Sequence, residues 1–142
     1  MSETTQTLDK AGIEAIFAGS PFLASLGLEV VKVDHEASEL TLRMPMAPPM
    51  ERRPGTGQFH GGPIAAFIDV AGDFALGMAL GGGVPTINLR IDFLKPAFGD
   101  SVTGVARVRR QGRTVTVVDV DVTDEKGSLV AVGRGTYATL RG

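Results

Sequence analysis

The chain has 142 residues, a length typical of one domain built around one hydrophobic core. Its net charge of −2, with no tryptophan and one tyrosine, argues against a nucleic-acid binder, which usually carries a basic face and aromatic residues for base stacking. The lack of cysteine excludes disulfides, thiol nucleophiles and cysteine–zinc sites, and it fits a reducing cytoplasm. The polar N-terminus does not resemble a signal peptide. The longest apolar stretch, near residues 63–80, contains two aspartates, so no membrane partner is expected.

The N-terminal segment predicts a short helix. The pattern of residues 8–18 is helical, and Thr7 is a suitable N-cap. Gly19 followed by Pro21 is expected to end the helix. Residues 1–7 are expected to form a loosely ordered tail.

A long apolar helix is predicted in the middle of the chain, over residues 61–80. Pro63 lies in its first turn, where the missing N–H of proline costs nothing, and a run of three glycines after Leu80 ends it. Apolar residues cover nearly all of its sides, which indicates a helix buried in the core. The preceding loop, residues 46–59, is rich in proline, glycine and arginine, and loops of this length in a compact domain are often functional.

Alternation of apolar and polar residues predicts strands on both sides of this helix. They cover residues 28–33, 39–44, 86–94, 101–110, 114–123 and 129–139. The apolar phase slips at Val117 and Val118, which suggests a bulge in that strand. One buried helix and about six strands indicate a single α+β domain over residues 1–142, with an antiparallel sheet curled round the helix.

Two aspartates stand out in the apolar helix. Asp69 lies at its middle among large apolar residues, and an unpaired buried carboxylate is costly, so it must be hydrogen-bonded, neutralised or used. Asp73 follows one turn later on the same face, where two like charges repel. We expect either a raised pKa for one of the two carboxyl groups or a solvent-filled cleft around the pair. The alternative is that both simply face solvent.

The start of the helix forms a turn suited to an anion. Gly61 and Gly62 leave backbone N–H groups free at the positive end of the helix dipole, where they can bind an anion or a developing oxyanion. Glycine also lets a ligand approach the backbone closely. His60 precedes them and could act as a base, although a histidine at such a junction is more often a capping or packing residue.

The spacing between these groups has a geometric consequence. Gly61 and Asp69 are eight residues apart, which is about 12 Å along a helix. One carbonyl group cannot touch both, so if both act on one substrate Gly61 must come from a second chain. A two-fold dimer with its helices side by side would form two equivalent composite sites. The chain has neither the GxSxG elbow of serine hydrolases nor a metal-binding HExxH motif.

The segment HGGPIAAFID, His60 to Asp69, resembles the HGG-x6-D signature of the hotdog-fold thioesterases, in the branch of the phenylacetyl-CoA thioesterases. The following GGGVPTINLRIDFLKPA, Gly81 to Ala97, is similar to that branch's third strand and its closing proline. The likeness extends over about residues 28–140. It implies a hotdog fold and hydrolysis of acyl-CoA thioesters. No metal or separate cofactor is implied, because coenzyme A is part of the substrate.

The resemblance also implies roles for individual residues. Asp69 matches the catalytic carboxylate, as general base or nucleophile, and Gly61 matches the residue whose backbone N–H polarises the thioester carbonyl. Thr86 matches a hydroxyl-bearing position that assists the carboxylate or a water. Strict alternation lets Thr86 reach Asp69 only from the end of its strand or across an interface. The resemblance further implies homodimers with composite sites, often paired into homotetramers.

Other residues are expected to contact the substrate. These are His60, Gly62, Gln58, Asp73 and Arg90. The branch usually has an asparagine six residues before the histidine, whereas this chain has Pro54, and Gln58 nearby is a candidate to replace it. The phosphates of coenzyme A are expected at arginines such as Arg90, Arg109 or Arg110.

The sequence therefore predicts a cytoplasmic acyl-CoA thioesterase that is a homodimer or a dimer of dimers. Pro54 favours one alternative, a non-catalytic acyl-CoA binding or sensor protein on the same fold. A hotdog dehydratase would need an Asp/His pair in one site, and His60 is the histidine available for it. A structural dimer without a ligand would leave Asp69 with no reason to be buried.

Overall fold

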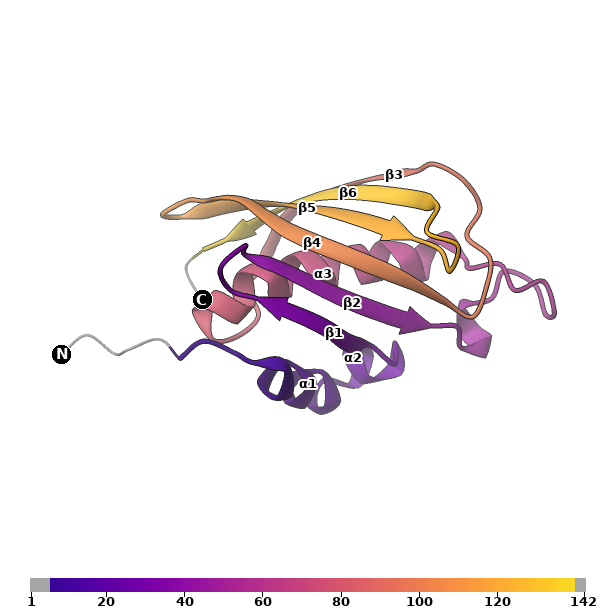
Figure 1. Cartoon of the computed structure of the whole chain (residues 1–142), viewed down its shortest axis with the longest axis horizontal. Helices are drawn as coiled ribbons and strands as arrows, with labels where there is room; N and C mark the ends of the chain where they lie inside the picture. Colours follow the sequence, from indigo (N-terminus) through magenta and orange to yellow (C-terminus); the bar gives the residue numbers. More distant parts are fainter. Residues whose placement is uncertain (1–5, 140–142) are drawn as a thin grey trace.

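The computed structural model describes residues 6–139 (Figure 1). Its elements are α1 (Lys10–Gly19), α2 (Pro21–Ser25), β1 (Glu29–Asp34), β2 (Glu39–Pro45), the short 3-10 helix η1 (Pro48–Met50), α3 (Gly61–Leu80), β3 (Thr86–Phe93), β4 (Ser101–Gln111), β5 (Val115–Thr123) and β6 (Leu129–Ala138). Both predicted helices and all six predicted strands are present, with bounds shifted by two residues at most. Of the predicted tail, residues 1–5 lie outside the described residues, and residues 6 and 7 have no regular secondary structure.

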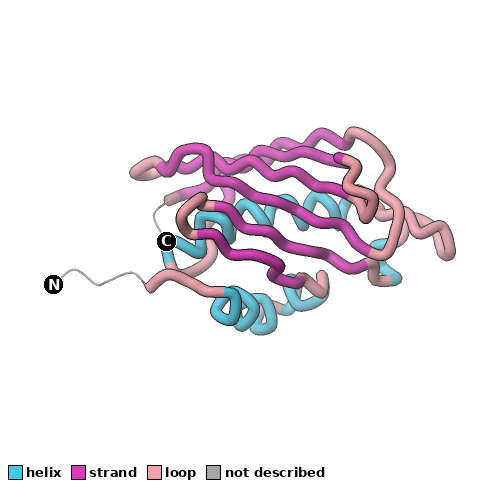
Figure 2. The backbone as a smooth tube through the Cα atoms, in the orientation of Figure 1, coloured by secondary structure: helices cyan, strands magenta, loops and turns pink. Residues whose placement is uncertain are grey.

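The six strands form one sheet in the order β1-β2-β4-β5-β6-β3 (Figure 2). Every neighbouring pair is antiparallel. The third strand along the chain pairs with the last one, so β1 and β3 are the two edges of the sheet. The sheet curves over α3, which lies behind it in Figure 1. The predicted α+β architecture, one sheet curled round one long helix, is confirmed.

α3 is buried because the inner face of the sheet packs along it. That face is built from alternate residues of the strands, among them Leu40, Leu42 and Met44 of β2 and Val118, Val120 and Val122 of β5. Two glycines of the sheet let the helix approach: a Cβ at Gly104 would meet the ring of Phe67, and one at Gly133 would meet Ile68. Phe67 and Ile68 are fully buried, and burial of each contributes about 1.5–3 kcal/mol.

α3 is also the one helix among residues 6–139 that is long and apolar enough to cross a membrane. In the structure 61% of its apolar 18-residue stretch is buried inside the fold. Packing in the core therefore accounts for its apolar surface.

The N-terminal helix differs from the prediction at both ends. Asp9, not Thr7, is the N-cap, and its carboxylate accepts a hydrogen bond from a backbone N–H of the first turn at 2.8 Å. Pro21 was expected only to end the helix, but it also begins α2, where a proline in the first turn loses no hydrogen bond. The ring of Phe17 in α1 meets that of Phe74 in α3 edge to face, with centroids 4.9 Å apart. This contact fixes α1 against the core.

The bulge predicted in β5 lies instead on its neighbour, β4. The extra residue is Arg109, between Val108, which pairs with Val118, and Arg110, which pairs with Val117. β5 itself alternates regularly between buried and more exposed positions. The two consecutive valines reflect a half-buried position at Val117 on the outer face, not a break in β5.

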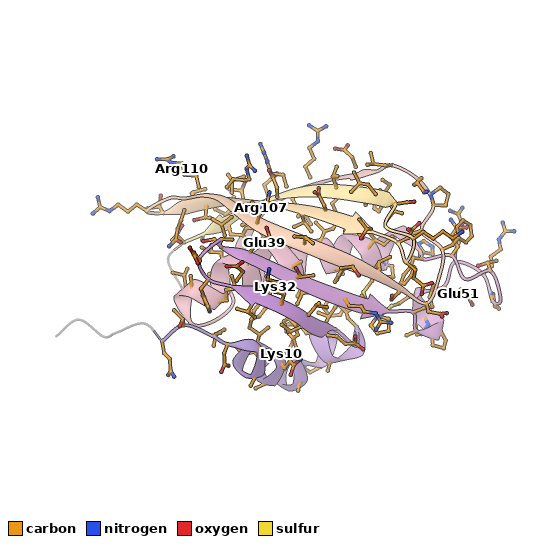
Figure 3. The ribbon with its side chains drawn as sticks, viewed as in Figure 1. Lys10, Lys32, Glu39, Glu51, Arg107 and Arg110 are labelled. Carbon is orange, nitrogen blue, oxygen red and sulfur yellow. The ribbon has the colours of Figure 1, made fainter. Side chains whose placement is uncertain are left out.

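The loop before α3 is folded around one carboxylate. Glu51 accepts hydrogen bonds from the N–H groups of Gly55 at 3.0 Å and Gly57 at 2.8 Å. The backbone N–H of His60 donates to the carbonyl of Met50 at 2.7 Å, which closes the loop. Figure 3 shows Glu51 at one end of the molecule, where α3 begins. The loop therefore delivers its last residues to the first turn of α3.

Candidate active site

Asp69 is half-buried at the middle of α3. Its Oδ1 accepts a hydrogen bond from Thr86 Oγ1 at 2.8 Å. The Tyr137 hydroxyl donates to the backbone carbonyl of Asp69 at 3.0 Å and lies 3.4 Å from Oδ1. Both hydroxyls approach the same carboxylate oxygen, and none of the described residues donates a hydrogen bond to Oδ2. Oδ2 is therefore the oxygen that remains available to a ligand.

Thr86 reaches Asp69 within one chain, from the start of β3. The register between β3 and β6 shifts between Thr86 and Asn88, so that Ile87 is an extra residue. This irregularity turns Thr86 toward the helix, although simple alternation places it with the outward-facing residues. The sequence left two routes open for Thr86, the end of its strand or an interface, and the structure shows the first.

Tyr137 is the residue at this carboxylate that the sequence analysis missed. It is fully buried, and a Cβ at Gly72 of α3 or at Gly135 of β6 would overlap its side chain. Burial, followed by the charges of Asp69 and Asp73, raises the pKa of Tyr137 far above its ordinary value. The hydroxyl therefore stays protonated and acts as a donor. The signal in the sequence is a glycine two residues before the one tyrosine, on the same face of a strand.

Asp73 ties the second half of α3 to the segment that leads into β3. Its Oδ1 accepts a hydrogen bond from the Val84 N–H at 2.7 Å. Burial raises the pKa of Asp73 to about 7; the Val84 hydrogen bond opposes this rise and the charge of Asp69 adds to it. The expectation of a raised pKa for one carboxyl of the pair is confirmed, with burial as its main cause. Because Val84 lies two residues before Thr86, Asp73 also helps to place the donor to Asp69.

The raised pKa of Asp73 predicts that the folded chain loses stability as the pH rises to neutrality. The folded state keeps this proton up to about pH 7, whereas an aspartate in the unfolded chain loses it near pH 3.8. Between these values the folded state binds more protons, so its stability falls with rising pH, by about 4 kcal/mol in all. Asp73→Asn keeps an acceptor for Val84, so it should raise the melting temperature at pH 8 and change it little near pH 4.

Thermal melts of both proteins at the two pH values measure this difference. Asp121→Asn is the control, because Asp121 is an exposed carboxylate on the outer face of β5. A shift of the same size at pH 4 and pH 8 would mean that the effect of Asp73→Asn does not come from the proton of Asp73.

The N-terminus of α3 presents the two predicted backbone donors. His60 is the N-cap, its backbone is extended, and its exposed side chain caps no N–H group. Within residues 6–139 the N–H groups of Gly61 and Gly62 have no acceptor. A Cβ at Gly61 would stand 3.4 Å from the ring of Phe93, while the space beside Gly62 is open. The turn therefore offers free donors at the positive end of the helix dipole.

A groove of about 380 Å³ opens beside Gly61. We call it the helix-start groove; it is lined by Arg52, Gln58, Phe59, Gly61, Ile64, Phe93, Leu94, Lys95, Pro96 and Ala97. Gln58 is thus brought next to Gly61, while Pro54 is exposed in the loop. Asp69 does not line this groove. Within one chain the structure therefore keeps Gly61 and Asp69 apart on a common helix, as the spacing predicted.

Arg90 is not brought to this site within one chain. It points from the outer face of β3 and forms an ion pair with Asp92, with 3.5 Å between Nε and Oδ2. Both residues line a groove on the outer face of the sheet. Asp69 lies on the inner side with α3, so the sheet separates it from Arg90. Arg110 lies at the end of the molecule opposite Glu51 (Figure 3).

Comparison with known proteins identifies the family. The sequence profile of the thioesterase superfamily matches residues 56–131, from the loop before α3 into β6. This chain belongs to the thioesterase superfamily. VNG_1336C of Halobacterium salinarum, which is named as an esterase, is 37% identical to it over an alignment of 130 residues, and the match covers 84% of this chain and 84% of the relative. The acyl-coenzyme A thioesterase PaaI of Escherichia coli (strain K12) is 29% identical and covers 90% of this chain and 89% of its own length.

A solved structure shows the same fold. The structure of zebrafish thioesterase superfamily member 2 matches this chain with a TM-score of 0.79 at 28% identity. The match covers 98% of this chain and 100% of the zebrafish chain. The hotdog fold and the thioesterase family, both expected from the HGG-x6-D segment, are thereby confirmed.

Proposed function

We propose that the protein hydrolyses acyl-CoA thioesters to the free acid and coenzyme A, in the cytoplasm, as a homodimer or a dimer of dimers. Membership of the superfamily gives thioester hydrolysis, and the name of the E. coli relative supports coenzyme A as the thiol. The observation that carries the proposal is the Asp69 carboxylate, whose Oδ1 is held by Thr86 and Tyr137 while Oδ2 stays open. A carboxylate anchored through one oxygen is oriented to act through the other.

The start of α3 supplies the hydrogen-bond donor for the thioester carbonyl in the proposed site. The thioester carbonyl oxygen accepts a hydrogen bond from the Gly61 N–H at the positive end of the helix dipole. Negative charge that builds on that oxygen is stabilised there. Because Gly61 has no Cβ, the carbonyl group can lie directly against the backbone, beside the ring of Phe93.

Asp69 can act in either of two ways. As a general base, Oδ2 takes a proton from water while the water oxygen forms a bond to the carbonyl carbon; the C–S bond then breaks, and the departing thiolate takes the proton. As a nucleophile, Oδ2 forms the bond itself and the thiolate leaves, after which water hydrolyses the mixed anhydride. Both routes yield the acid and coenzyme A, and both need Gly61 and Asp69 at one carbonyl group.

A dimer brings these two residues together in the proposal. Within one chain they are eight residues apart on α3, or about 12 Å. Helices packed side by side about a two-fold axis would place Asp69 of the partner subunit near Gly61. The edge strand β3 supports this arrangement, because its Ile87 and Phe93 are 58% and 55% exposed in the single chain.

Release of free thiol from a panel of acyl-CoAs tests the proposed function. The panel covers short, medium and long straight chains together with phenylacetyl-CoA, and a thiol reagent follows coenzyme A as it appears. We expect turnover of at least one of these esters. Heat-denatured protein provides the background rate.

Binding of acyl-CoA without release of thiol would favour the alternative, a non-catalytic sensor. The observation behind that alternative is the exposed Pro54, which stands where the branch it resembles has an amide side chain. We propose instead that Gln58, which lines the groove beside Gly61, orients the water or the substrate.

A further inference from the structure

The helix-start groove continues into a second depression, and basic side chains line both. The groove contains Arg52 and Lys95. The second depression, of about 310 Å³, is lined by Arg52, Arg53, Gln58 and a threonine. Since Arg52 and Gln58 belong to both, the two form one continuous surface that begins at Gly61. Among the described residues, no acidic side chain lines either part.

We call Arg52, Arg53 and Lys95 the basic shelf. All three are exposed, and none forms an ion pair with any residue of the described part of the chain. The neighbouring acid, Glu51, is occupied by two backbone N–H groups of its own loop. The shelf therefore carries three positive charges with no neutralising partner.

The arginines that were expected to bind the phosphates have different surroundings. Arg110 lies at the end of the molecule opposite Glu51 (Figure 3). Arg90 pairs with Asp92, and Asp119 binds both Arg109 and Arg134, so these three arginines each have a carboxylate within 3.5 Å. An incoming phosphate would have to compete with those carboxylates, which it does not have to do at the basic shelf.

We propose that the basic shelf binds the phosphates of coenzyme A and that the helix-start groove holds its pantetheine arm. This inference rests on the proposed function, because it places the thioester at Gly61. From that point the arm runs along the apolar wall formed by Ile64 and Phe93, and Gln58 is positioned to hydrogen-bond its amides. The phosphates then meet three free cations, of which the two arginines can bind phosphate oxygens in a bidentate manner.

Hydrogen bonds of the backbone, and not of the charged side chains, hold the basic shelf in place. The Arg52 N–H donates to the Gln58 carbonyl at 2.8 Å, and the Lys95 N–H donates to the Val130 carbonyl at 3.3 Å. The Glu51 carboxylate accepts two backbone hydrogen bonds from the turn that contains Arg53. Substituting the three side chains therefore leaves these structural hydrogen bonds in place, and the variants are expected to fold.

The triple variant Arg52→Gln, Arg53→Gln, Lys95→Gln tests the shelf with two substrates. Octanoyl-CoA carries the phosphates, and the octanoyl thioester of pantetheine does not. We expect the KM for octanoyl-CoA to rise about tenfold or more at nearly unchanged kcat, because uniform binding is lost. Kinetics with the pantetheine thioester should match the wild type. Added salt should raise the KM for octanoyl-CoA in the wild type and much less in the variant.

Arg113→Gln is the matched control. Arg113 is an exposed arginine in the turn between β4 and β5, and it has no ion pair within the described residues. This variant should keep the wild-type KM for octanoyl-CoA. An unchanged KM for octanoyl-CoA in the triple variant would overturn the proposed role of the basic shelf. An equal rise of the KM for the phosphate-free thioester would overturn it as well.

Calorimetry separates failure of this inference from failure of the proposed function. If the wild type releases thiol from no acyl-CoA, the proposed function fails, but binding of coenzyme A itself can still be measured. A dissociation constant raised about tenfold in the triple variant supports the shelf. An unchanged constant, or no binding to the wild type, overturns it.

Discussion

Replacing Asp69 with Asn should lower kcat for acyl-CoA hydrolysis about a thousandfold and change KM little. The amide has the size of the carboxylate and can still accept the hydrogen bond that Thr86 donates at 2.8 Å. It cannot take a proton from water, and it cannot attack a carbonyl carbon as a carboxylate does. The loss therefore reports the chemical role of Asp69 and not its place in the fold. Thiol release under saturating acyl-CoA measures it.

Two controls accompany this variant. Asp121→Asn removes a carboxylate from the outer face of β5 and should keep the wild-type kcat. The melting temperature and the oligomeric state of Asp69→Asn should match those of the wild type. If the variant turns over acyl-CoA at close to the normal rate, Asp69 takes no part in the reaction.

Local features of the sequence were enough to predict that α3 is buried and that the aspartates within it need hydrogen-bond partners or a chemical role. A helix that is apolar on nearly all sides has to be buried, and a carboxylate inside it needs a reason to be there. The structure supplies that reason as hydrogen bonds from Thr86 and Tyr137 to Asp69. It also shows that burial raises the pKa of Asp73. Sequence could not show how deeply either carboxyl group is buried, because that depends on the sheet packed against α3.

Features that depend on strand pairing were not predictable in the same way. The irregularity at Ile87 that turns Thr86 toward the helix comes from pairing between β3 and β6, and the bulge at Arg109 comes from pairing between β4 and β5. Tyr137 contacts Asp69 across 68 residues of sequence. No local pattern in the sequence predicts contacts between residues that are so far apart along the chain.

The basic residues show the same limit. In the sequence, Arg52 and Arg90 are both arginines on expected surfaces. Alternation along the strand already puts Arg90 and Asp92 on one face, but the fold was needed to show that Arg52 lines a groove next to Gly61. Charge along the chain therefore does not show which basic residues lie near the start of α3.

The proposed composite site rests on the spacing between Gly61 and Asp69, and Gly61→Pro allows it to be tested. Gly61 is the first residue of α3, a position where proline is well tolerated, and His60 already has the extended backbone that a residue before proline requires (φ −68°, ψ 152°). The substitution removes the N–H proposed to bind the carbonyl oxygen, so kcat should fall about a hundredfold or more. Gly61→Ala keeps that N–H and adds a Cβ 3.4 Å from Phe93, so a smaller loss in this variant than in Gly61→Pro separates removal of the N–H from crowding by the Cβ.

Mixing Asp69→Asn and Gly61→Pro chains should then restore activity that neither variant has alone. Each mixed dimer contains one site built from the native Gly61 of the first chain and the native Asp69 of the second. Random pairing makes about half of the dimers mixed, each with one intact site, so about a quarter of the wild-type activity should return. The two variants are denatured together, refolded and assayed against the same variants refolded separately. Activity no higher than the sum of the separate samples would overturn the composite site, and with it the joint action of Gly61 and Asp69 on one carbonyl group.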